Sequence, residues 1–268
     1  MSTSQLPAQA VTDRVRTVVG AQRVALHEPS FQGKEWAYVK ECLDTGWVSS
    51  VGSYVDRFER DLTAYAGAAD AVVVSNNTSG LQVALQLVGV MPGDEVVIPA
   101  LSFVATANAV RHCGAWPHFA DVDNATLGLG MPALADHLDA VLEQRDGVSV
   151  NRHSGRRMAA IVPMHTIGHP VDMPALMAQA ERHGIAAVED AAESLGSFID
   201  GRHTGTFGLC GMLSFNGNKI VTTSGGGALI TNDAQLARRA KHLTTTAKQP
   251  YPGPSFTTKW PTTTACPT

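Results

Sequence analysis

Short runs of apolar residues rich in valine and isoleucine alternate along the chain with longer segments of helical spacing. Seven runs predict strands, at residues 71–75, 95–99, 118–122, 159–163, 186–190, 212–215 and 227–231. Five segments predict helices, at residues 80–90, 106–113, 131–143, 173–183 and 233–242. Because the strands are apolar throughout rather than alternating, we expect helices on both faces of the sheet. The pattern predicts a three-layer α/β/α domain with a mostly parallel, seven-stranded sheet.

Two segments depart from this alternation. Residues 144–157 (QRDGVSVNRHSGRR) are polar and rich in turn formers, which predicts a surface loop. From residue 250 onward the sequence PYPGPSFTTKWPTTTACPT has no periodicity and does not resemble the end of an α/β domain. We therefore divide the chain into an N-terminal arm (1–23), a large domain (24–250) and an aberrant tail (251–268).

Composition and charge narrow the class of protein. Hydrophobic residues make up 44% and charged residues 16%, and a net charge of −4 gives no basic surface for nucleic acid. No apolar run approaches the ~20 residues of a membrane helix, and no segment resembles a signal peptide, so we expect a cytoplasmic protein. The scattered cysteines form no CxxC pair, which favours free thiols over disulfides or a metal site: Cys42, Cys113, Cys210 and Cys266.

The first candidate site is the turn after the first predicted strand, Asn76-Asn77-Thr78-Ser79-Gly80. Small polar residues and a glycine at a helix N-terminus present unpaired backbone N–H groups and the positive end of the helix dipole, which hold a phosphate. A simple N-cap by Thr78 or Ser79 is the alternative. This segment by itself leaves both interpretations open.

The second candidate is the segment Val188-Glu189-Asp190-Ala191-Ala192-Glu193 at the end of an apolar strand. Carboxylates there lie at the edge of the sheet where open α/β folds bind ligands. Asp190 is suited to pair with a protonated ring nitrogen, which makes the ring an electron sink. The alternative is that Asp190 only caps a following helix.

The third candidate is Lys219, in SFNGNKIVTTSGGG. This lysine lies in an apolar, glycine-lined turn with few acidic residues nearby. Burial there favours its neutral amine, which is the form that attacks an aldehyde. A surface lysine is the alternative, and the Walker spacing is missing. Taken together, the three segments supply a phosphate cradle, a carboxylate for a ring nitrogen and a lysine for an aldehyde. These are the three handles of pyridoxal phosphate.

With these motifs in place, the chain resembles the sugar aminotransferases of the DegT/DnrJ/EryC1/StrS family, a branch of the fold-type I enzymes that depend on pyridoxal phosphate. The resemblance spans about residues 24–250. It rests on GWVSSVGSYVDRFE, SNNTSGLQVAL, PGDEVVIPALSFVATANAV, EDAAESLGS and SFNGNKIVTTSGGG. It implies the large domain of that fold, pyridoxal 5'-phosphate as cofactor, and a homodimer whose pockets are built from two chains.

The resemblance also implies roles for single residues. Lys219 holds the cofactor as a Schiff base and then shuttles a proton, and Asp190 pairs with the pyridine nitrogen. Phe103 occupies the aromatic position that stacks on the ring. Three hydroxyl residues contact the cofactor phosphate: Thr78, Ser79 and Ser214.

Other positions match the family less closely. Glu193 stands near the ring hydroxyl, where the family often has glutamine or histidine. Segment 46–50 lies near the sugar nucleotide in relatives, which implies substrate contacts for Trp47, Val48 and Ser49. We interpret His165 and His169 in MHTIGHP as histidines that pack a loop, with substrate contact as the alternative.

The finer resemblance concerns the substrate. Several segments resemble enzymes that move an amino group, from glutamate, to C4 of a UDP-4-keto-6-deoxy-N-acetylhexosamine, in the legionaminic acid and bacillosamine branch. The sequence GNK before two threonines also resembles perosamine synthases, so a GDP-linked sugar stays open. A sugar dehydratase is a rival, but relatives that dehydrate often replace the lysine with histidine, and Lys219 argues against it.

The tail suggests a change of reading frame. Relatives continue after KHLTTTAK with a segment like HDEVAYNYRMPN and then a smaller domain, which we expect to be missing here. Codons chosen for PGPSFTTKWPTTTACP encode WAFVHDEVAYNYRMP when read two bases later. We therefore predict a frameshift near residues 251–252 and a truncated, catalytically impaired enzyme. Sequencing the gene through codons 245–268 tests this.

Overall fold

The computed structural model describes residues 8–20, 23, 25 and 27–247. The predicted tail (251–268), and with it the frameshift hypothesis, lies outside the described residues. The proposed division of the chain into arm, domain and tail therefore stays a prediction.

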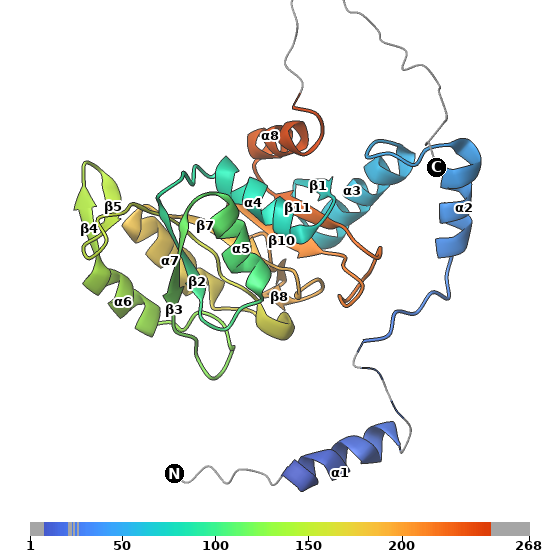
Figure 1. The fold of residues 1–268 in the computed structure, drawn as a ribbon, viewed down its shortest axis with the longest axis horizontal. Helices are drawn as coiled ribbons and strands as arrows, with labels where there is room; N and C mark the ends of the chain where they lie inside the picture. The colour runs from blue at the N-terminus through green and yellow to red at the C-terminus, as the bar shows by residue number, and fades with distance from the viewer. Residues whose placement is uncertain (1–7, 21–22, 24, 26, 248–268) are drawn as a thin grey trace, which may run out of the picture.

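The described residues form a central seven-stranded sheet with the order β1-β11-β10-β7-β6-β2-β3 (Figure 1). Its strands are β1 (Asp70–Val74), β2 (Glu95–Pro99), β3 (Trp116–Ala120), β6 (Met158–Ile161), β7 (Ala186–Asp190), β10 (Cys210–Ser214) and β11 (Gly227–Thr231). Within this described sheet only β11 pairs antiparallel with its neighbours, and the other pairs are parallel. The predicted seven strands and the mostly parallel sheet are confirmed.

Helices flank this sheet, and two further helices precede it. The helices are α1 (Ala8–Val19), α2 (Glu35–Thr45), α3 (Ser53–Ala66), α4 (Asn77–Leu87), α5 (Val104–His112), α6 (Ala133–Val141), α7 (Met173–His183) and α8 (Ala234–Thr244). The last five correspond to the five predicted helices, whereas α1 to α3 were not predicted. The residues that begin and end a helix are clear in α7. Asp172 caps its start by accepting the Ala175 N–H, and Gly184 ends it in the left-handed conformation.

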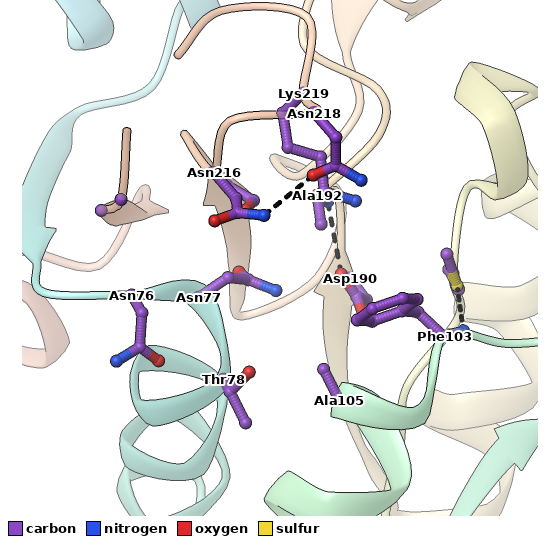
Figure 2. Close-up of a pocket in the computed structure, with 14 residues that line it drawn as sticks. Asn76, Asn77, Thr78, Phe103, Ala105, Asp190, Ala192, Asn216, Asn218 and Lys219 are labelled. Carbon is purple, nitrogen blue, oxygen red and sulfur yellow. Dashed lines mark hydrogen bonds between the residues drawn. The ribbon is translucent and has the colours of Figure 1, made fainter. Parts of the chain in front are cut away.

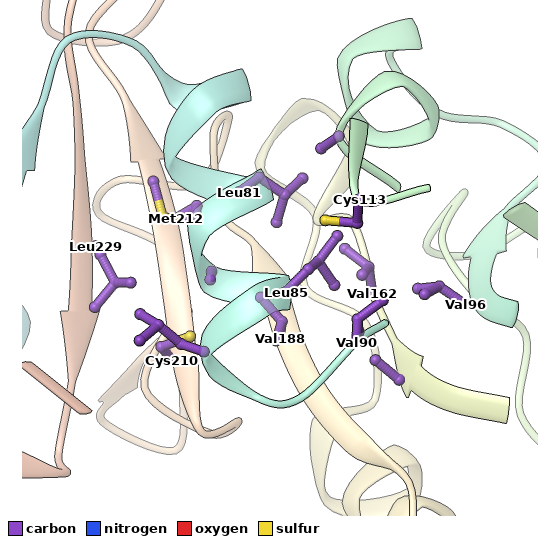
Figure 3. Packing of buried hydrophobic residues seen from close by; sticks show 14 of the residues in the cluster. Leu81, Leu85, Val90, Val96, Cys113, Val162, Val188, Cys210, Met212 and Leu229 are labelled. Carbon is purple, nitrogen blue, oxygen red and sulfur yellow. The ribbon is translucent and has the colours of Figure 1, made fainter. Parts of the chain in front are cut away.

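Helices cover both faces of the sheet. Helices α4, α5 and α8 pack on one face and α3, α6 and α7 on the other. Successive side chains of β2 point to opposite faces of the sheet. Val96 and Ile98 pack on the face covered by α4, α5 and α8, whereas Val97 packs on the face covered by α6 and α7. Figure 3 shows Leu81 and Leu85 of α4 packed against the strands. Both leucines are fully buried, so replacing either with alanine is expected to cost about 2–5 kcal/mol.

The predicted surface loop at residues 144–157 is wrong in part, because its first half is a β-hairpin. Strands β4 (Leu142–Arg145) and β5 (Val148–Asn151) pair antiparallel. They are joined at Asp146 and Gly147, whose φ angles of 51° and 81° are those of a tight hairpin turn. The Asp-Gly pair was the signal that the sequence interpretation missed. Asn151 is buried and donates to Glu95 Oε2 at 2.7 Å, which fixes the hairpin to β2.

Some classes of feature are absent from the part of the chain that the structure describes. In residues 8–20 and 27–247 no helix is long and apolar enough to cross a membrane. The described residues contain no cluster of three or more histidine, cysteine or acidic side chains able to hold a metal ion. Three cysteines fall within the described range, and all three are free thiols: Cys42, Cys113 and Cys210.

Candidate functional site

A cavity of about 240 Å³ opens where the carboxyl ends of parallel strands meet the start of β11. Strands β1, β6, β7 and β10 all end at this edge, so the residues that follow them converge there. The cavity is lined by Asn76, Asn77, Thr78, Phe103, Ala105, Met164, Asp190, Ala192, Ser214, Asn216, Asn218, Lys219, Gly225 and Gly226 (Figure 2).

One wall of the cavity is the N-terminus of α4. Asn76 is the N-cap, because its side-chain Oδ1 accepts the Ser79 N–H at 2.8 Å. The alternative in which Thr78 or Ser79 serves as the cap is therefore wrong. Thr78 lines the cavity, whereas Ser79 lines a second hollow beside it, together with Ser49. The predicted contact of Ser79 with a phosphate stays a prediction.

Glycines next to the start of β11 lie opposite the N-terminus of α4. Gly226 has a φ of 112°, a conformation that residues with a side chain rarely adopt. A Cβ atom on Gly227 would lie 2.8 Å from the Leu213 carbonyl oxygen and 2.9 Å from the Asn77 nitrogen. The glycines therefore let the start of β11 approach the first turn of α4. Together the two segments form an anion cradle built largely from backbone.

Asn77 adds a polar group that has no hydrogen-bond partner among the described residues. Its side chain is buried, and its Oδ1 accepts no hydrogen bond from any described residue. Buried polar atoms are normally paired, so an unpaired one in a cavity wall indicates room for a polar ligand.

Asp190 is the buried acid of the cavity. It ends β7 with 2% of its surface exposed, and its carboxylate accepts the Thr106 hydroxyl at 2.6 Å and the Ala192 N–H at 3.3 Å. Burial raises the pKa of Asp190, although these hydrogen bonds act against it. The described residues after Ala192 form turns and not a helix, so the alternative of a helix cap is wrong. A buried carboxylate with this environment suits a cationic partner.

Lys219 enters the cavity from the loop between β10 and β11, and it has an acidic partner. Its Nζ donates to Glu193 Oε1 at 3.0 Å, with only 10% of the lysine side chain exposed. The expectation of little oppositely charged company was therefore wrong, because the turn after β7 folds back over the loop. The Phe103 ring centroid lies 5.5 Å from the same nitrogen. The structure thus brings an amine, an aromatic face and a buried acid to one cavity.

Glu189, directly before Asp190, points to the opposite face of β7 and is fully buried. It accepts the backbone N–H groups of Gly205, Phe207 and Gly208, each at 2.7 Å, and contacts His165 Nε2 at 3.0 Å. His165 Nδ1 accepts the Val171 N–H, so Nε2 carries the proton. His165 therefore packs a loop, as predicted.

The structure separates the remaining predicted residues. Thr78, Phe103, Asp190, Ser214 and Lys219 share the cavity, and Glu193 joins it through Lys219. Trp47 and Val48 are exposed by 60% and 69% and do not line it. Their substrate contacts, like that of Ser49, stay predictions.

Sequence reasoning missed several residues of the site. Four asparagines that line the cavity were assigned no role, although Asn76 and Asn77 lie in the first candidate segment: Asn76, Asn77, Asn216 and Asn218. The available signal was their spacing, since an adjacent pair follows β1 and the NGN triplet precedes Lys219. Thr106 was also missed, because its contact with Asp190 joins residues 84 positions apart.

Comparisons with known proteins agree with this geometry. The sequence matches the DegT/DnrJ/EryC1/StrS aminotransferase family over residues 29–259. It is 38% identical over 221 residues to the GDP-perosamine synthase of Caulobacter vibrioides, covering 82% of this chain and 55% of that protein.

Two solved structures extend the agreement to the fold. The aminotransferase TlmJ from Streptoalloteichus hindustanus matches with a TM-score of 0.72 and 37% identity, over 82% of this chain and 56% of that one. DesI, solved in the presence of its TDP-sugar product, matches with a TM-score of 0.70 and 32% identity, over 81% of this chain and 51% of that one. The chain spans about half the length of the curated relatives it matches.

Proposed function

Because the chain belongs to the DegT/DnrJ/EryC1/StrS aminotransferase family, we propose that it is an aminotransferase dependent on pyridoxal phosphate, acting on a nucleotide-linked keto sugar. The observation that carries the proposal is the single cavity shared by Lys219, Asp190 and the α4 cradle. Lys219 matches the aldehyde of the cofactor, Asp190 matches its ring nitrogen, and the α4 cradle matches its phosphate.

The residues present fit this cofactor. The first turn of α4 and the glycines before β11 would hold its phosphate, with the hydroxyls of Thr78 and Ser214 beside them. Asp190 would face the ring nitrogen. A cationic nitrogen there would offset the burial that now raises the pKa of this acid. Phe103 would lie against the ring.

Pyridoxal phosphate supplies an aldehyde that condenses with amines and a pyridinium ring that stabilises a carbanion. The chain itself supplies orientation, charge and proton transfer. Lys219 Nζ is the group that would take a proton from the substrate carbon and return it. Only 10% of the Lys219 side chain is exposed, which limits the water that would compete for that proton.

Two nucleotides are candidates for the substrate. Amination at C4 of a UDP-4-keto-6-deoxy-N-acetylhexosamine, with glutamate as donor, is supported by the resemblance of the segments around residues 25–52 and 241–248. A GDP-linked 4-keto sugar is supported by the similarity to GDP-perosamine synthase. A panel of both keto sugars, with glutamate as donor, distinguishes them by the amino sugar that forms.

Two further properties belong to the proposal. A homodimer and a cytoplasmic location come from the resemblance and from the sequence pattern. Phe31, Trp36, Trp47 and Val48, exposed on the segment around α2, offer apolar surface for a second copy of the chain. Sedimentation of the purified chain measures its oligomeric state.

A direct experiment tests the proposed cofactor. The 268-residue chain is incubated with pyridoxal phosphate, reduced with borohydride, digested and mapped by mass spectrometry. We expect the added mass on the peptide that contains Lys219 and not on the peptide that contains Lys241. Modification spread evenly over surface lysines would contradict the assignment. No modification at all would favour the catalytically impaired fragment.

A further inference from the structure

The carboxylate of Glu193 is shared between two partners. Oε1 accepts from Lys219 Nζ at 3.0 Å, and Oε2 accepts the backbone N–H of Ile167 at 2.9 Å. Glu193 therefore joins the lysine loop to the short 3₁₀ turn η1 (Thr166–Gly168) after β6. Through this one carboxylate, two segments about 50 residues apart in the sequence meet.

Ile167 is held in an unfavourable backbone conformation. Its φ and ψ are 52° and 30°, in the left-handed region that β-branched residues avoid. Its side chain is 76% exposed, so burial does not stabilise this conformation. Strained backbone persists only where neighbouring contacts hold it, and here the Glu193 carboxylate supplies such a contact.

A second contact fixes the other end of the turn. Ser197 Oγ donates to the Gly168 carbonyl at 2.7 Å. A Cβ on Gly168 would lie 3.1 Å from the Glu193 carbonyl oxygen, so the two turns approach closely. Met164, two residues before η1, lines the cavity and accepts the Phe103 N–H on its sulfur at 3.4 Å. The turn η1 therefore begins two residues after Met164 of the cavity wall, although none of its own residues lines the cavity.

The charge on Lys219 stabilises this arrangement. Burial alone would raise the pKa of Glu193, but the Ile167 N–H and the Lys219 ammonium outweigh it and lower that pKa. His27 adds a weaker effect in the same direction. The Glu193 side chain is 26% exposed, so water can reach it. Without the ammonium, the unpaired carboxylate gains by turning toward water, which weakens its bond to Ile167.

We infer that Glu193 is a positioning residue that couples the charge on Lys219 to the turn η1. While the lysine is a free ammonium, Glu193 holds Ile167 in its strained conformation. When the nitrogen loses that charge, η1 loosens. The inference rests on the proposed function in one respect, since it takes Lys219 as the amine that carries the cofactor.

Hydrogen exchange of the Ile167 amide in the cofactor-free 268-residue chain tests the coupling. We expect Lys219→Met to speed exchange on the order of tenfold, the scale of a hydrogen bond to a charged group. Lys219→Arg, which keeps a cation, should stay within about twofold of the native chain. Glu193→Ala should have the largest effect, and Glu193→Gln, which keeps an acceptor without charge, an intermediate one.

A matched control comes from elsewhere in the chain. Lys241 also donates to a glutamate, Glu59, that accepts a backbone N–H. Lys241→Met should leave exchange at Ile167 unchanged. Acetylation of Lys219 in the folded native chain removes the charge without a substitution and should reproduce the effect of Lys219→Met.

The inference is overturned if Lys219→Met and acetylation leave Ile167 exchange unchanged while Glu193→Ala speeds it. It is also overturned if Lys219→Arg speeds exchange as much as Lys219→Met does. The readout needs no cofactor and no turnover. A failure here therefore leaves the cofactor-trapping experiment untouched, and a failed trapping experiment leaves this measurement valid.

Discussion

Two lysine–glutamate pairs in this chain, one at the cavity and one on helix α8, differ in their surroundings rather than in the ion pair itself. Lys219 contacts Glu193 at 3.0 Å, and Lys241 contacts Glu59 at 2.6 Å. In both pairs the carboxylate also accepts a backbone N–H. The two pairs therefore agree in charge and in the backbone hydrogen bond to the carboxylate, and both lysines contact their glutamate directly.

The surroundings of the two lysines differ. Lys219 is 10% exposed and lies at a cavity with Phe103 and the buried Asp190. Lys241 is 37% exposed, belongs to α8 and lies outside that cavity. An ion pair with glutamate thus does not identify a functional lysine. The features that distinguish Lys219 are the buried Asp190, the Phe103 ring and the cavity beside them.

Replacing each lysine by methionine gives the largest expected difference between the two pairs. Lys219→Met should abolish trapping of pyridoxal phosphate by borohydride, because the condensing amine is gone. Lys241→Met should leave trapping unchanged. Absorbance of the reduced adduct and peptide mapping measure both. Equal loss in the two variants would show that the pairs do not differ as described.

Replacement of the buried acid should have the next largest effect. Asp190→Asn removes the charge that would face the ring nitrogen, and we expect the dissociation constant for the cofactor to rise by about ten- to hundredfold. Equilibrium titration by absorbance measures this. Asp139→Asn, at an exposed ion pair with Arg182, is the control and should not change binding.

The same substitution should stabilise the chain without cofactor. Because burial raises the folded-state pKa of Asp190, this residue favours folding most at low pH, and that contribution is lost as pH rises from the unfolded value of about 3.9 through the folded value. At pH 7 Asp190→Asn should therefore raise the free energy of unfolding by about 1 kcal/mol. Urea unfolding at pH 7 measures it, and a loss of stability would contradict this view of Asp190.

The pair of Lys241 and Glu59 should affect stability but not cofactor binding. Lys241→Met removes a half-exposed partner of Glu59, and we expect the free energy of unfolding to fall by up to about 1 kcal/mol. Thermal or urea unfolding measures the change. A loss of several kcal/mol would place Lys241 in the core of the fold instead of at its surface.

Acid should weaken the Glu193 pair with a small effect on stability. Its folded-state pKa is lowered, so its contribution is present above the unfolded value of about 4.3 and is lost as pH falls through the folded value. We expect roughly 0.5 kcal/mol at pH 7, which Glu193→Gln removes. Urea unfolding from pH 7 to pH 3 should show the two chains converging at low pH. Parallel curves would contradict the assignment.

The sequence predicted the sheet well because its strands are buried on both faces. Runs such as residues 95–99 and 186–190 each contain three consecutive apolar residues, and their limits agree with β2 and β7. Helix α2 was missed because it buries none of its residues and its apolar stripe is weak. Helix α3 carries a clear apolar stripe, with Leu62 and Ala66 buried, which the sequence interpretation overlooked. The hairpin at residues 142–151 was missed because its polar residues hid an Asp-Gly turn.

The site was predictable in its parts but not in its contacts. Asp190 ends a predicted strand, and Thr78 and Lys219 lie in the turns that follow predicted strands, so topology brings the three together. The Glu193 contact was not predictable, because the turn after β7 folds back by backbone hydrogen bonds that leave no pattern in the sequence. The same holds for the left-handed Ile167, which nothing in its residue type suggests.

The reversed direction of β11 has a consequence for engineering. Because β10 and β11 are antiparallel neighbours, the Lys219 loop leaves and re-enters the sheet at adjacent positions, closed at its base by the bond from Phe215 N–H to the Gly226 carbonyl at 3.0 Å. We therefore expect that the loop at residues 216–225 can be replaced by loops of other length without changing the order of the sheet, as long as the core residue Phe215 and the closing Gly226 are kept.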